Sequence, residues 1–145
     1  MIYSPIKVVV CCESGRLRSK YFAREISKEF RSRGIEAEVI AAGIRNTDKN
    51  PFSSPLKFLA YMFMRPMTKS IADNSDHIIV MEPWMYKKAT NDLAQPPEKV
   101  ICYNTRDCEI PFMFLPLLNQ SQKEQIKSHV NNYFSTFFPI RSSTC

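Results

Sequence analysis

Cys12 and Arg18 are the residues of this sequence whose types and spacing are best suited to chemistry. Cys12 closes an apolar run that begins at Ile6, and Arg18 lies six positions later with Ser19 beside it. A thiolate is a strong nucleophile, and a planar guanidinium can hold two oxygens of a tetrahedral oxyanion at once. The Ser19 hydroxyl can donate a hydrogen bond to such a thiolate. The pattern therefore indicates attack by Cys12 on a bound oxyanion.

The loop between Cys12 and Ser19 connects an expected strand to an expected helix. A Val-rich run predicts a buried strand over residues 6–11, and apolar residues at positions 22, 26 and 30 predict an amphipathic helix over residues 19–33, closed by Gly34. Backbone N–H groups and the positive end of the helix dipole attract an anion to such a loop, and favour the thiolate form of a neighbouring cysteine. The loop residues that we expect to contact the oxyanion are Glu13, Ser14, Gly15, Arg16 and Leu17.

Short apolar runs alternate with amphipathic segments along the rest of the chain. We expect further strands over residues 37–42, 77–81 and 99–102, and helices that begin at Ser54-Pro55 and that cover residues 83–93 and 121–138. This alternation predicts an α/β fold: a three-layer sandwich with a central four-stranded parallel sheet and helices on both faces. Ligands in such folds bind at the carboxyl ends of the strands, where Cys12 lies. We expect a single domain over residues 1–145.

The cysteines do not form a metal or disulfide pattern. The five of them, at positions 11, 12, 102, 108 and 145, are an odd number without C-x-x-C spacing or a nearby histidine. We therefore expect neither a structural metal nor a disulfide framework. Strand alternation directs Cys11 to the sheet face opposite Cys12, where it is expected to be a core residue.

Charge and hydropathy limit the partners. The net charge is +6, and residues 7–33 alone carry eight Lys and Arg against three Glu. Because aromatic residues are not interleaved with this basic segment, we favour a small anion at one site and expect no nucleic acid partner. The apolar runs are shorter than the ~20 residues of a membrane span, and no secretory signal is evident, so we expect a cytoplasmic protein without a membrane partner.

Residues 8–19, which read VVVCCESGRLRS, match the pattern C-x5-R-S after an N-terminal hydrophobic strand. In this the chain resembles the low-molecular-weight protein tyrosine phosphatases, and more closely a small predicted tyrosine phosphatase branch of that superfamily. Residues 41–43, Ala-Ala-Gly, look like the Ser-Ala-Gly that ends the family's second strand. Residues 72–82, ADNSDHIIVME, are similar to the family's third strand, "ADLIxVM".

The resemblance implies hydrolysis of phosphomonoesters without metal or cofactor, through a phosphocysteine. The substrate would be a phosphorylated protein, with phosphotyrosine favoured, or a small phosphomonoester. Cys12 would be the nucleophile, Arg18 the phosphate clamp and Ser19 the partner of the thiolate. Aligning residues 100–107 with the branch's "VIxLDIPD" places the general acid at Asp107, with Glu109 as the competing candidate.

Two other functions stay open at this point. Glu13 places a carboxylate beside the thiolate, which would suit an inactive module that only binds phosphate or a phosphoprotein. The same loop, with Cys102 or Cys108 as a resolving thiol, would suit a thiol-dependent arsenate reductase.

Overall fold

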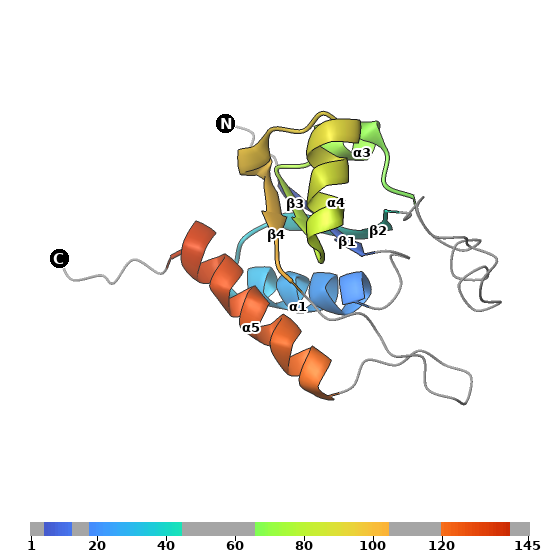
Figure 1. The fold of residues 1–145 in the computed structure, drawn as a ribbon. Helices are drawn as coiled ribbons and strands as arrows, with labels where there is room; N and C mark the ends of the chain where they lie inside the picture. Colours follow the sequence, from blue (N-terminus) through green and yellow to red (C-terminus); the bar gives the residue numbers. More distant parts are fainter. Residues whose placement is uncertain (1–4, 13–17, 45–65, 105–119, 140–145) are drawn as a thin grey trace.

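The computed structural model describes residues 5–12, 18–44, 66–104 and 120–139 (Figure 1). Its strands are β1 (Ile6–Cys12), β2 (Ala37–Gly43), β3 (His77–Val80) and β4 (Val100–Cys102). Its α-helices are α1 (Arg18–Ser32), α3 (Lys69–Asp73), α4 (Pro83–Lys87) and α5 (Gln120–Phe137). A π-helical segment, Lys88–Asp92, continues α4, and a 3-10 turn, Pro97–Lys99, precedes β4.

The strands form one parallel sheet in the order β2-β1-β3-β4. β1 lies in the interior of the sheet, and its residues from Val8 to Cys12 are all buried. This burial on both faces explains the continuous apolar run at this position of the sequence, because a strand covered on both sides needs no polar alternation. The prediction of four parallel strands is confirmed.

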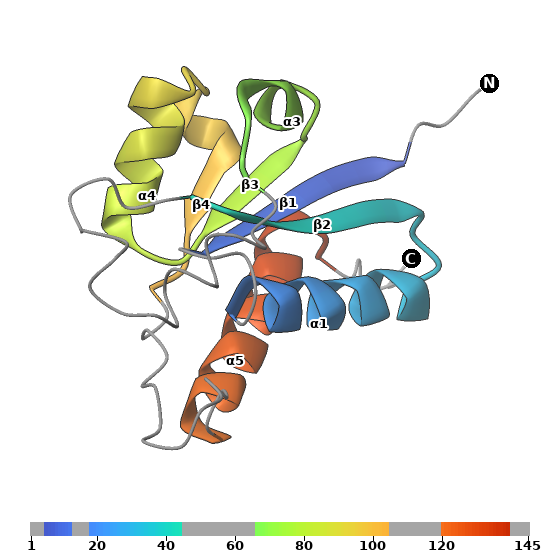
Figure 2. The same ribbon diagram turned by 90° about the vertical axis from the view of Figure 1, so that its right-hand side faces the viewer.

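Helices cover both faces of the sheet (Figure 2). α1 and α5 lie together on one face, and α3 and α4 lie on the other. The register assigns side chains to these faces, because Val8 pairs with His77, whose ring contacts Tyr133 of α5. Even-numbered β1 residues, Cys12 among them, therefore face α1 and α5. The predicted three-layer architecture is confirmed.

α1 agrees with its sequence pattern. Phe22, Ile26 and Phe30 are fully or almost fully buried, and the helix ends just before Gly34, which has a φ of 68°. A positive φ is accessible to glycine without steric cost, so Gly34 lets the chain turn toward β2. The observed bounds, Arg18–Ser32, differ from the predicted 19–33 by one residue at each end.

Two helical segments differ from the prediction. α3 was not expected: its five residues are too few to show a repeating amphipathic pattern, and its N-terminus is capped by Thr68, whose Oγ1 accepts a hydrogen bond from Ile71 N at 3.2 Å. The helix expected over residues 83–93 changes to π geometry after Lys87, where the Thr90 hydroxyl donates to the Tyr86 carbonyl at 3.0 Å. The helix expected from Ser54-Pro55 lies outside the described residues.

Candidate active site

The expected oxyanion loop lies between Cys12 and Arg18. Cys12 is the last residue of β1 and Arg18 is the first of α1. Cys12 and Arg18 are each 2% exposed, and Ser19 is fully buried. The loop residues expected to contact the oxyanion, positions 13–17, lie outside the described residues. The described part of the site is thus a thiol and a guanidinium at the carboxyl end of the sheet.

The Cys12 thiol is in direct contact with the Ser19 hydroxyl. Cys12 Sγ lies 3.2 Å from Ser19 Oγ, and both side chains are buried. A hydroxyl in this position can donate to a thiolate, and burial removes the competition from bulk water. The pairing expected from the sequence is present in the structure.

Cys11 has the core position expected for it. Its side chain is fully buried, and this burial, aided by the charge of Cys12, raises the pKa of the Cys11 thiol far above its ordinary value. Cys11 therefore stays protonated and unreactive at neutral pH. Of these adjacent thiols, Cys12 is the one that contacts the Ser19 hydroxyl.

Glu82, a residue with no role expected from the sequence, joins Arg18 at this site. Arg18 Nη2 lies 3.3 Å from Glu82 Oε2, and the Glu82 side chain is 30% exposed. Glu82 precedes α4 as its N-cap residue, yet its side chain makes no capping hydrogen bond and reaches Arg18 instead. Its position just after the buried strand β3 was a usable signal, because parallel strands bring their carboxyl ends to one edge.

The ion pair between Arg18 and Glu82 compensates a buried charge. An almost buried guanidinium is costly unless an anion or hydrogen-bond acceptor compensates its charge. Glu82 supplies a carboxylate through one oxygen and contacts one of the two Nη atoms. Since a guanidinium carries five N–H donors, pairing with Glu82 is compatible with a two-point grip on an oxyanion. Glu82 thus helps to hold the Arg18 side chain at the carboxyl end of the sheet.

The candidate general acids lie in the segment after β4. Asp107 and Glu109 are both outside the described residues. So is Cys108, the second candidate for a resolving thiol. The last described residue before them, Asn104, is held by α5: its carbonyl accepts from Gln125 Nε2 at 3.2 Å and lies 3.0 Å from His129 Nε2. Helix α5 therefore fixes the point at which the chain leaves the sheet.

Cys102 lies at the same edge of the sheet but at a distance from Cys12. It pairs with Val80, which in turn pairs with Cys11, so two interstrand spacings, about 10 Å, separate Cys102 from Cys11. A disulfide needs Cα atoms within about 7 Å. Burial, followed by the negative charge of Glu82, raises the pKa of the Cys102 thiol. This position does not favour Cys102 as a resolving thiol for Cys12.

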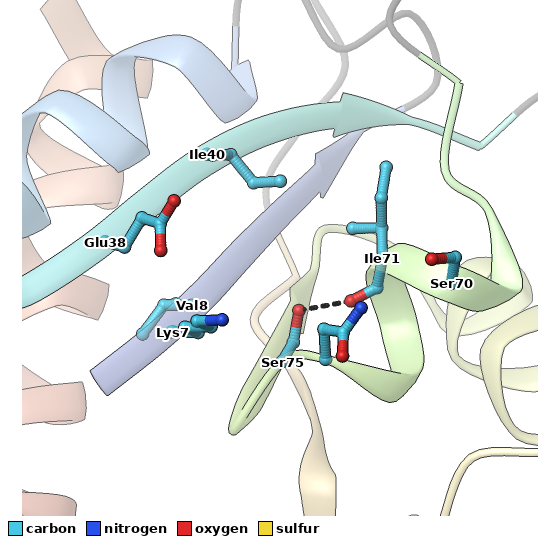
Figure 3. A pocket seen from close by; sticks show the side chains of 8 residues that line it. Lys7, Val8, Glu38, Ile40, Ser70, Ile71 and Ser75 are labelled. Atoms are coloured by element: carbon cyan, nitrogen blue, oxygen red, sulfur yellow. Dashed lines mark hydrogen bonds between the residues drawn. The ribbon is translucent and has the colours of Figure 1, made fainter. Parts of the chain in front are cut away.

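A separate cavity of about 180 Å³ opens on the α3 side of the sheet (Figure 3). Lys7 and Glu38 line it from β1 and β2, and Ser70 and Ile71 line it from α3. Lys7 precedes Cys12 by five residues of extended strand, about 16 Å, so this cavity is distinct from the thiol site.

The described ranges contain no cluster of three or more His, Cys, Asp or Glu that could hold a metal ion. Within the same ranges, no helix has the length and apolar character of a membrane span.

The sequence matches no family model and no curated protein. Solved structures do resemble it. A YwlE arginine phosphatase, as a cysteine-to-serine mutant with a phosphorylated active-site serine, has a TM-score of 0.66 at 12% identity, over 94% of this chain and 98% of that chain. A low molecular weight protein tyrosine phosphatase from T. tengcongensis has a TM-score of 0.66 at 12% identity, over 90% and 99%.

A third structure, the tyrosine phosphatase Wzb from Escherichia coli K30 in complex with phosphate, has a TM-score of 0.61 at 15% identity, over 92% of this chain and 99% of that chain. These likenesses extend over nearly the whole of each chain, and they agree with the parallel sheet and its two helical layers. The chain therefore has the fold of the low molecular weight protein tyrosine phosphatases.

Proposed function

We propose that this chain is a cysteine-dependent phosphatase that hydrolyses phosphomonoesters, with phosphotyrosine in proteins as the favoured substrate. The observation that carries the proposal is the pairing of the Cys12 thiol with the Ser19 hydroxyl, 3.2 Å apart, at the start of the helix whose first residue is the almost buried Arg18. A fold shared with known tyrosine phosphatases supports it. The proposal assigns the activity to one domain over residues 1–145.

The reaction would proceed in two displacements at phosphorus. In the first, the Cys12 thiolate forms an S–P bond, the P–O bond to the leaving group breaks, and a general acid protonates the departing oxygen. In the second, water attacks phosphorus, the S–P bond breaks, and the conjugate base of that acid accepts the water proton. Arg18 and loop N–H groups would stabilise the charge on the equatorial oxygens.

The roles of the remaining residues follow from their chemistry. Ser19 would stabilise the Cys12 thiolate, first as the attacking group and then as the leaving group of the second step. Asp107 is the proposed general acid, and Glu109 is the competing candidate. The loop residues at positions 13–17 are proposed to supply the N–H groups that bind phosphate.

Bound oxyanions in similar structures support the proposed ligand class. Wzb from E. coli K30 holds phosphate, and the YwlE mutant carries its phosphoryl group on the active-site serine. That serine stands where a cysteine was replaced, which is the position a phosphocysteine would take. Because these neighbours are a tyrosine phosphatase and an arginine phosphatase, the substrate test compares a phosphotyrosine peptide with a phosphoarginine peptide.

A single substitution tests the nucleophile. Cys12→Ser should lower para-nitrophenyl phosphate turnover by more than about 10³-fold, because an alcohol is a far weaker nucleophile than a thiolate. Cys102→Ser is the matched control, since it makes the same substitution at the same sheet edge, and it should keep turnover within about twofold. Turnover retained by Cys12→Ser would contradict the proposal.

The general acid is tested by leaving-group dependence. Asp107→Asn should lower phenyl phosphate turnover about 10²-fold or more, and para-nitrophenyl phosphate turnover much less, because only the poorer leaving group needs protonation. Glu109→Gln is the matched variant. If Glu109→Gln alone shows this selective loss, the acid is Glu109 and the assignment of Asp107 is wrong.

Binding without catalysis would give a different result. Phosphate or vanadate would then raise the melting temperature of the wild-type protein while no phosphomonoester is turned over. That outcome would replace the phosphatase with a phosphate-binding module.

A further inference from the structure

The solvent face of α1 carries a line of positive charge. Lys20, Arg24, Lys28 and Arg31, called here the basic stripe, are all exposed. Their spacings of four, four and three residues place them on one side of an α-helix. The buried residues of α1 face the opposite side, toward the sheet. The stripe is therefore a continuous feature of the surface.

The N-terminal part of the stripe is unfavourable for the helix that carries it, whereas Arg31 lies in the last turn, where the helix dipole favours a cation. The first turn of α1 contains no acidic residue, although its N-terminus is the positive end of the helix dipole. Lys20, Arg24 and Lys28 repel one another as like charges at i, i+4 spacing. Glu25 offsets part of this repulsion, because its carboxylate lies 3.7 Å from the Lys28 ammonium, whereas Glu29 pairs with Arg33, which is outside the stripe. Helix stability alone does not explain this arrangement.

The stripe begins at the proposed active site. Lys20 directly follows Ser19, which contacts Cys12. From Lys20 to Arg31 the helix rises about 16 Å, so successive charges are about 4.5–6 Å apart along the helix axis. Side chains on one side of an extended peptide repeat every ~6.6 Å. The stripe thus matches about five residues of an extended chain that leaves the active site.

We propose that the basic stripe binds acidic residues next to the phosphorylated residue, so that the preferred substrates are phosphorylated polypeptides rich in Asp and Glu. This inference rests on the proposed phosphatase function. A polypeptide fits better than a nucleic acid, because binding to nucleic acid draws on broader basic faces with many phosphate contacts. Here the cations form a single line that starts at one phosphomonoester site.

Two phosphotyrosine peptides test the proposal, one with Asp and Glu beside the phosphotyrosine and one with Ala and Ser there. The measured quantity is the ratio of their kcat/KM values. We expect the wild-type protein to favour the acidic peptide about 10-fold at low salt and less at 0.3 M NaCl, because exposed charges are screened. Lys20→Gln/Arg24→Gln should reduce this ratio several-fold.

A matched double variant separates the stripe from total charge. Lys7→Gln/Lys87→Gln removes two exposed lysines from β1 and α4 and should leave the ratio as it is in the wild-type protein. An equal reduction in both double variants would show a general charge effect and overturn the proposal. So would a ratio near one in the wild-type protein.

A binding measurement keeps this test independent of turnover. If the wild-type protein hydrolyses no phosphopeptide, the proposed function fails. Fluorescence anisotropy with the labelled acidic peptide, carrying tyrosine in place of phosphotyrosine, then tests binding to the basic stripe alone. Weaker binding by Lys20→Gln/Arg24→Gln than by the control supports an acidic polypeptide as partner. Equal binding by the two variants, or tighter wild-type binding to an oligonucleotide or to phosphatidylserine vesicles, overturns it.

Discussion

Cys12 and Ser19 meet because a strand ends and a helix begins at the same edge of the sheet. They are seven residues apart in sequence, and their Sγ and Oγ atoms lie 3.2 Å apart. Alternation along β1 turns Cys12 toward the α1 side and Cys11 toward the other, so two adjacent thiols have different environments. Both are buried, but the Cys12 thiol contacts the Ser19 hydroxyl, and the Cys11 thiol faces the other side of the sheet. A shift of one residue in strand register would exchange these positions.

Glu82→Gln should destabilise the protein through Arg18. The variant keeps the size of the side chain but removes its charge, so the almost buried guanidinium loses its carboxylate partner. We expect the free energy of unfolding, measured with urea, to fall by about 1–3 kcal/mol. Phosphate should raise the melting temperature more in the variant than in the wild-type protein, because the anion replaces the lost charge and no longer faces a nearby carboxylate.

A partly exposed ion pair, between Glu29 of α1 and Arg33 just after this helix, gives the control. Glu29→Gln removes the partner of Arg33 at 2.8 Å, and such surface pairs contribute about 0–1 kcal/mol. The loss caused by Glu82→Gln should also shrink in an Arg18→Ala background, since the two side chains act as a pair. A loss that is as large in that background would show that Glu82 acts on something other than Arg18.

The elements themselves were largely predictable from the sequence. β1 and β3 were evident as short runs rich in Val and Ile, interrupted or preceded only by Lys7 and His77, and α1 was evident as an amphipathic period closed by Gly34. These signals are local, so each window of sequence contains its own information. α3 was not predictable in this way, because its five residues are too few for a repeating pattern and the local contact at its start is a single side-chain cap from Thr68.

The candidate site was predictable only in part. Cys12, Arg18 and Ser19 lie within eight consecutive positions, and the strand-to-helix transition brings them together. Glu82 is 64 residues from Arg18, and the two come together only through the pairing of β1 with β3. Sequence alone does not show which charged residues at the sheet edge form an ion pair, because that depends on the order of the strands. The assignment of the general acid to Asp107, with Glu109 as the competing candidate, stays a prediction.

At the scale of the whole molecule, the aromatic residues of α5 join the sheet to α1. Tyr133 packs against His77 of β3 at a ring distance of 5.5 Å, and Phe134 packs against Phe30 of α1 at 4.8 Å. His77 Nδ1 lies 2.6 Å from the Tyr133 hydroxyl. Burial raises the pKa of Tyr133 above its ordinary value, so this hydroxyl stays protonated and can donate to a neutral His77.

The His77 contact predicts a loss of stability below neutral pH. Burial lowers the pKa of His77, and the charge of Asp76 opposes this only in part. Between the unfolded value of about 6.5 and the lower folded value, the unfolded chain binds a proton that the folded protein does not. The free energy of unfolding should therefore fall as the pH drops from 7.5 to 5.5, by less than about 1 kcal/mol at this half-buried position.

Urea denaturation of variants at both pH values isolates this contribution. In His77→Gln the decrease between pH 7.5 and 5.5 should become smaller, because the residue that titrates differently in the two states is gone. His129→Gln, which removes the other histidine of the chain, should reduce the decrease less. If His77→Gln instead enlarges the decrease, the folded protein stabilises the charged form of the His77 ring. The contact between β3 and α5 would then hold an imidazolium that donates to the Tyr133 hydroxyl, rather than a neutral ring that accepts from it.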